Sequence, residues 1–199
     1  MKMEWYWILI ILSAIVGPFE AMHAVNRARR NREEAEKKRQ EGKNMINQPE
    51  TGMLSAQAEE LIREEPWYVA VLSNLSALIM QAMPGLNWAG FYLIRGDMLT
   101  VGPFQGKPAC IRIPVGKGVC GTAVERNETI VVPDVHAFPG HIACDSASAS
   151  EIVIPIHAGG RIIGVLDIDS PELNRFTEQD RRTLEALVRV IEEKTAWDL

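Results

Sequence analysis

Two apolar segments in the C-terminal half of the chain constrain the fold more than any other feature of the sequence. Residues 152–157 and 161–169 are each long enough for a strand, and only Ala158-Gly159-Gly160 separates them. A short connection that contains two glycines is typical of the tight turn of a β-hairpin. The two segments are therefore predicted to be neighbouring antiparallel strands.

Shorter apolar segments upstream continue this pattern, and helical periodicity lies on either side of them. Strands are expected at residues 88–94, 98–104, 111–115 and 129–132. Helices are expected at residues 55–63, 67–83 and 119–125, and from Thr177 onward. Helices around about five or six mostly hairpin-linked strands predict an α+β fold, with the helices on one face of a mostly antiparallel sheet. The βαβ alternation of a doubly wound fold is absent from the sequence.

The first part of the chain differs from the rest. Residues 5–19 are apolar and uncharged, begin with Trp5-Tyr6-Trp7, and are followed by a basic cluster at residues 27–32. About 20 apolar residues span hydrocarbon, interfacial aromatic residues flank such segments, and the basic side is cytoplasmic. Residues 1–26 are therefore predicted to be a membrane-anchoring helix, which would tether the following domain, on the cytoplasmic side, to the plasma membrane. The alternative is a misassigned start codon that adds non-native residues.

Residues 27–52 are interpreted as a charged helical stalk and linker. Glu33 and Lys37, and likewise Glu34 and Lys38, are favourable helical pairs. Residues 53–199 then have the pattern of a compact domain. The net charge of −5 argues against a general nucleic-acid binder.

Three cysteines, Cys110, Cys120 and Cys144, are too few and too widely spaced for a disulfide scaffold. They form no CxxC pair, so the usual zinc pattern is missing, and no metal is expected. All three lie in or beside predicted loops with polar neighbours, where chemistry is often carried. Their local context leaves two interpretations open, namely structural thiols and thiol–disulfide cycling.

Three carboxylates are expected near one end of the sheet. Asp167 and Asp169 end a predicted strand and share one face by alternation, and Glu151 begins the neighbouring strand. Such groups could simply enter solvent at a strand end. Because carboxylates held together repel each other, the arrangement also indicates a cation between them, either a metal ion or a ligand ammonium.

Aromatic residues mark the first predicted strand. Alternation places Trp88 and Tyr92 on one face and Phe91 on the other. Most such rings belong to a core, but a ring face can also line a pocket for a cation or a thioether.

Together these motifs resemble the free methionine-(R)-sulfoxide reductases, which are built on a GAF domain. The resemblance covers about residues 53–193 and includes all three cysteines and all three carboxylates. It implies a single GAF-like domain for residues 53–199, whereas the first 50 or so residues have no counterpart in the compact family form. The matching segments are residues 87–92, 102–110, 113–123, 134–136, 140–145, 150–153 and 164–170.

The resemblance implies roles for the three cysteines. Cys144 would attack the sulfoxide sulfur, release free methionine and become a sulfenic acid. Cys110 would resolve it as an intramolecular disulfide, with Cys120 as an alternative or relay thiol. Thioredoxin would then reduce the disulfide, and no bound cofactor is implied.

The resemblance also implies how free L-methionine-(R)-sulfoxide is bound. Glu151, Asp167 and Asp169 would hold its ammonium group, and one of them, kept protonated by its neighbours, would donate to the sulfoxide oxygen. Trp88 and Tyr92 would enclose the methyl-thioether end. Backbone N–H groups between Cys110 and Cys120 would bind the substrate carboxylate.

Another class of function fits the same features. A GAF-type sensor of a small molecule or of redox state would use the pocket and the cysteines without catalysis. GAF domains often pair through their terminal helices, so the predicted stalk favours a homodimer.

Overall fold

The computed structural model describes residues 27, 29, 30, 32 and 51–198. The predicted anchor and most of the predicted stalk lie outside these residues, so both stay predictions, as does the boundary at residue 52. Within the described part of the chain, no helix is long and apolar enough to cross a membrane. The elements below belong to the unit Pro49–Leu199.

Six strands form one antiparallel sheet in the order β3-β2-β1-β6-β5-β4. The predicted hairpin of β5 and β6 is confirmed, and a second hairpin of β1 and β2 joins it because β1 pairs with β6. This pairing brings two strands from opposite ends of the domain's sequence to the middle of the sheet, where Phe91 pairs with Leu166. The strands are β1 Trp88–Arg95, β2 Met98–Gly106, β3 Arg112–Pro114, β4 Ile130–Val132, β5 Ser150–Ala158 and β6 Arg161–Ser170.

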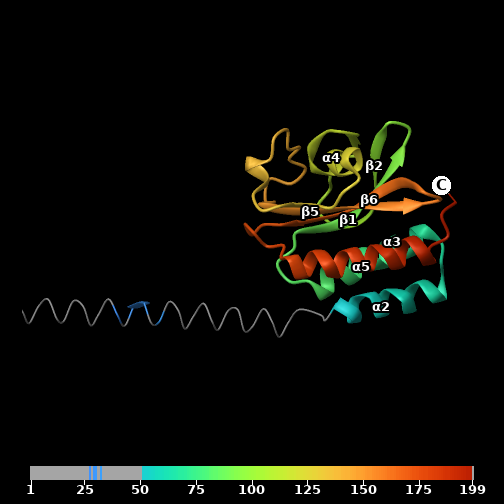
Figure 1. The fold of residues 1–199 in the computed structure, drawn as a ribbon, viewed down its shortest axis with the longest axis horizontal. Coiled ribbons are helices and arrows are strands. Elements are labelled where there is room, and N and C mark those ends of the chain that lie inside the picture. Colours follow the sequence, from blue (N-terminus) through green and yellow to red (C-terminus); the bar gives the residue numbers. More distant parts are fainter. Residues whose placement is uncertain (1–26, 28, 31, 33–50, 199) are drawn as a thin grey trace, which may run out of the picture. The chain divides into compact units, whose positions relative to one another are not determined.

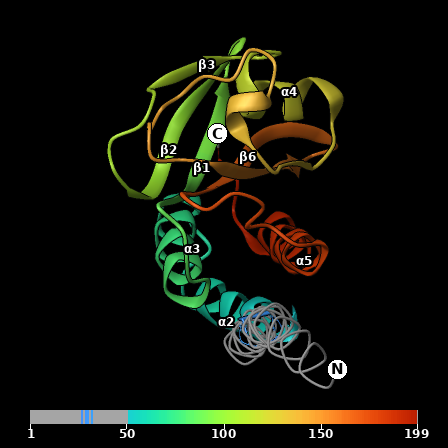
Figure 2. The same cartoon turned by 90° about the vertical axis from the view of Figure 1, so that its left-hand side faces the viewer.

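Helices cover both faces of this sheet (Figure 1 and Figure 2). On one face α3 and α5 lie against the strands, and α2 packs on the outer side of these two helices. The expectation that the helices share a face is wrong for α4, whose Val119 and Ala123 pack against the opposite face of the sheet. The helices are α2 Thr51–Glu64, α3 Tyr68–Ala82, α4 Gly118–Arg126 and α5 Glu178–Lys194, and a 3-10 turn spans Val135–Ala137.

The sheet separates two apolar cores, as strand alternation requires. Phe91 and Leu166 face the core under α3 and α5. Trp88, Tyr92 and Val165 face the core under α4. The predicted division of the β1 aromatic residues between the two faces is therefore confirmed.

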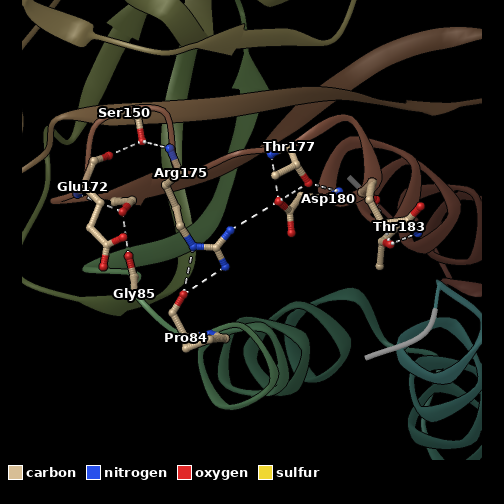
Figure 3. Close-up of polar contacts among 10 residues, drawn as sticks. Pro84, Gly85, Ser150, Glu172, Arg175, Thr177, Asp180 and Thr183 are labelled. Atoms are coloured by element: carbon tan, nitrogen blue, oxygen red, sulfur yellow. Dashed lines mark hydrogen bonds and ion pairs between the residues drawn. The ribbon is translucent and has the colours of Figure 1, made fainter. Parts of the chain in front are cut away.

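Two serines fix the strand ends that carry the carboxylates (Figure 3). Ser150 donates a hydrogen bond to the Glu172 carbonyl at 2.6 Å, and Ser170 donates one to the Gly85 carbonyl at 2.6 Å. The Glu172 N–H donates in turn to the Ser170 hydroxyl at 3.0 Å. Ser150 precedes Glu151 and Ser170 follows Asp169 in their strands, so both serines face away from the carboxylates. They therefore hold the same strand ends from the face that α3 and α5 cover.

Arg175 connects these strand ends to two helices (Figure 3). Its guanidinium donates twice to the Pro84 carbonyl after α3, at 2.9 and 3.0 Å, and once to Asp180 at 3.2 Å. Asp180 and Thr177 form the capping box that begins α5, as their spacing in the sequence predicts. The sheet end therefore has a rigid polar support beneath it.

Candidate active site

The structure brings the three carboxylates together on the α4 face of the sheet. Glu151 pairs with Asp169 across β5 and β6, and Asp167 lies two residues before Asp169 on the same face. Glu151 and Asp167 are each only 6% exposed. Their side chains therefore share a largely dry space near one end of the sheet.

Burial and mutual repulsion raise the pKa of all three carboxyl groups. Burial raises the pKa of Asp167 to about 6. For Glu151 and Asp169, burial and then the negative charge of Asp167 raise the pKa well above the ordinary value. Both effects favour the protonated form of each carboxyl group over the charged form.

This proton uptake predicts how stability depends on pH. The pKa of Asp167 is 3.8 in the absence of these effects and about 6 in the folded protein, so between these values the folded state binds more protons. Its contribution to stability is complete below the lower value and is lost as the pH rises through the higher one. Asp167→Asn cannot ionise, so we expect the variant to gain several degrees in unfolding midpoint relative to the parent as the pH rises through this window.

Scanning calorimetry of parent and variant across this pH window measures the effect. Asp97→Asn, which changes an exposed carboxyl in the β1–β2 turn, is the matched control. A difference in unfolding midpoint between parent and Asp167→Asn that stays constant with pH would contradict the prediction.

Two of the three cysteines form a disulfide. Cys110, after β2, is bonded to Cys144, in the loop before β5, with their Cα atoms 5.3 Å apart. Cys120 lies instead within α4, fully reduced and buried. Its thiol donates to Glu151 Oε1 at 3.9 Å, and burial followed by the charge of Asp167 raises its pKa.

An ion pair holds together the two loops that carry the disulfide. Lys107 Nζ lies 3.3 Å from the Asp145 carboxylate, and Asn87 donates to the same carboxylate at 3.2 Å. A hydrogen bond from the Ala147 N–H, assisted by Lys107, lowers the pKa of Asp145. Sequence reasoning gave Lys107 and Asp145 no role, although they lie three residues before Cys110 and one after Cys144.

Trp88 and Tyr92 support the same region from inside. Their rings stack with centroids 5.8 Å apart and are only 2% and 1% exposed. Trp88 Nε1 donates to the Lys107 carbonyl at 3.2 Å, and the Tyr92 hydroxyl donates to the Cys110 carbonyl at 3.1 Å. In this disulfide form the two rings therefore hold the loop of Cys110 and do not line the cavity beside the carboxylates.

A small cavity lies between α4, the loop of Cys144 and the strand ends. Its volume of about 20 Å³ is enough for roughly one water molecule and too small for an amino acid. His141 is on its wall, with Nε2 3.9 Å from Glu151 Oε2. Its pKa is lowered by burial and by His136. The wall also contains Ile113, Gly118, Val119, Cys120, Ile142, Cys144, Asp145, Ser148, Asp167 and Asp169.

Comparison with known proteins gives consistent matches over this domain. The GAF domain pattern matches residues 69–193. The free methionine-R-sulfoxide reductase of Escherichia coli K12 is 54% identical over 136 residues, which cover 68% of this chain and 82% of that protein. The Saccharomyces cerevisiae free methionine-R-sulfoxide reductase is 48% identical and covers 62% of this chain and 73% of its own length.

A solved structure extends the match to three dimensions. The free methionine-R-sulfoxide reductase from Neisseria meningitidis, in complex with its substrate, superposes with a TM-score of 0.70 at 45% identity. The matched region covers 72% of this chain and 87% of that one.

Proposed function

This chain belongs to the free methionine-R-sulfoxide reductase family of GAF-domain proteins, and on that premise we propose that its domain reduces free L-methionine-(R)-sulfoxide to L-methionine. The observation that carries the proposal is the disulfide of Cys110 and Cys144 beside a group of buried carboxyl side chains whose pKa values are raised by burial. Such a site combines a thiol that can accept oxygen, a second thiol that can resolve it, and an acid.

The chemistry divides between the two cysteines. The Cys144 sulfur attacks the sulfoxide sulfur, the oxygen is transferred with a proton, and methionine leaves while Cys144 becomes a sulfenic acid. The Cys110 thiol then attacks the Cys144 sulfur, water leaves, and the disulfide forms. Thioredoxin returns both to thiols and is itself oxidised to a disulfide. One sulfoxide and one dithiol thus give one methionine, one disulfide and one water.

The carboxylates serve both binding and proton transfer. Glu151, Asp167 and Asp169 hold the substrate ammonium, and the member that retains a proton donates it to the sulfoxide oxygen. Backbone N–H groups between Cys110 and Cys120 bind the substrate carboxylate. A peptide-bound methionine sulfoxide lacks both charges and is excluded. For the reduced form we keep the prediction that Trp88 and Tyr92 face the thioether.

A coupled assay tests the proposal. NADPH oxidation in the presence of thioredoxin, thioredoxin reductase and free L-methionine-(R)-sulfoxide is expected to show sustained turnover. The N-acetylated amide of the same sulfoxide should give no rate above background, because it carries neither charge. Absence of turnover with intact thiols would contradict the reductase and favour the sensor.

A further inference from the structure

The outer side of the disulfide carries exposed apolar side chains. Ile111, directly after Cys110, is 69% exposed, more than any other large apolar side chain among residues 53–198. Pro108 lies on the other side of Cys110, and Ala143 directly precedes Cys144, and both are exposed. We call these three residues the Ile111 patch. Exposed apolar residues that gather around a reactive group are typical of an interaction site.

The two sulfurs of the disulfide differ in what they face. Cys144 lines the cavity beside the carboxylates, whereas Cys110 does not. The cavity of about 20 Å³ is too small to admit a cysteine of another protein together with the residues that flank it. A protein thiol must therefore approach from outside, where Cys110 is flanked by Pro108 and Ile111.

We infer that the protein dithiol that reduces this disulfide docks on the Ile111 patch and attacks Cys110, so that Cys144 is the sulfur released. The inference rests on the proposed function and adds to it the docking surface and the site of attack. The three side chains of the patch are apolar, whereas the exposed Lys107 and Arg112 lie directly beside Pro108 and Ile111 in sequence. The complementary surface around the reactive cysteine of the partner is therefore apolar at its centre. Thioredoxin, the reductant of the proposed function, is this partner.

The exchange balances in two steps. The partner thiolate forms a bond to Cys110 Sγ, the bond between Cys110 and Cys144 breaks, and Cys144 leaves as a thiolate beside the cavity. The second thiol of the partner then attacks the partner's first cysteine sulfur in the mixed disulfide. The partner's own disulfide forms, and Cys110 is released as a thiol. The enzyme gains two electrons and the partner loses two. This order leaves Cys144 free for the next sulfoxide while the partner is still attached.

The variant Ile111→Ser tests the docking surface. It removes exposed apolar area while leaving the backbone carbonyl of residue 111, which accepts a hydrogen bond from Val101, in place. We expect kcat/KM for thioredoxin to fall about tenfold, since most of an isoleucine side chain no longer becomes buried on docking. Turnover driven by dithiothreitol, which needs no docking surface, should stay at the parent rate.

Met53→Ser is the matched control, because Met53 is 54% exposed and lies on α2. Met53→Ser should change neither kcat/KM for thioredoxin nor the turnover driven by dithiothreitol. An unchanged kcat/KM for thioredoxin in Ile111→Ser would overturn the docking surface, and so would an equal fall with both reductants. Failure of the proposed function itself would instead appear as absent turnover of the parent with either reductant.

Trapping identifies the sulfur that is attacked. A thioredoxin whose second active-site cysteine is replaced by serine forms a stable mixed disulfide with the oxidised enzyme. Peptide mapping by mass spectrometry should locate the partner on Cys110. A cross-link to Cys144 would overturn the inference.

Discussion

Cys144→Ser should abolish the reduction of free L-methionine-(R)-sulfoxide with either thioredoxin or dithiothreitol. A serine hydroxyl has a far higher pKa than a thiol and does not accept oxygen from a sulfoxide, so the loss should be at least roughly 10³-fold. The fold should be preserved because Cys144 lies in a loop and the two side chains differ by one atom. The measurement is NADPH oxidation in the coupled assay, with methionine determined by chromatography.

Cys110→Ser separates attack from resolution. It should release about one methionine per enzyme in a single turnover and then stop with thioredoxin, because the sulfenic acid finds no partner thiol. Sustained turnover of the sulfoxide by this variant with thioredoxin as reductant would show that Cys120 resolves the sulfenic acid instead. A parent rate in Cys144→Ser would show that the nucleophile has been assigned to the wrong cysteine.

Glu151→Gln should lower kcat/KM by roughly 10² to 10⁴, the range that a general acid contributes. One Glu151 oxygen lies 3.9 Å from the Cys120 thiol and the other 3.9 Å from His141, so this carboxyl sits inside the cavity wall. An amide has the same shape but neither supplies an acidic proton nor carries a charge for the ammonium. Steady-state kinetics at varied sulfoxide concentration measure the effect.

The division of the effect between kcat and KM identifies the role. A fall in kcat with little change in KM indicates the proton donor, whereas a rise in KM alone indicates ammonium binding. Glu128→Gln, an exposed carboxylate paired with Arg126, should behave as the parent. A parent value of kcat/KM in Glu151→Gln would remove this residue from the site.

Local sequence signals were sufficient for the elements and for the faces of the strands. The turn at residues 158–160 and the start of the last helix at Thr177 depend on neighbours in sequence, and both were predicted. Alternation placed Trp88 and Tyr92 on one face of their strand, and Asp167 and Asp169 on one face of theirs. The position of α4 was not predicted, because a short amphipathic helix fits either face until the whole sheet is formed.

The parts of the site that were missed depend on contacts between distant loops. Lys107 and Asp145 are 38 residues apart and meet only when the loops of Cys110 and Cys144 converge. Either side chain taken alone is an ordinary surface charge. The wall position of His141 has the same origin, since the loop that carries it has no periodic pattern to predict its direction.

The small size of the cavity has a practical consequence for the search for inhibitors. A library screened in air would meet mainly the oxidised protein, in which this space holds about one water molecule. Compounds that mimic the amino acid would then be discarded as inactive, although the proposed function requires the reduced protein to admit them. Screening under reductant, or with Cys110→Ser, which cannot form the disulfide, tests such compounds on the reduced site.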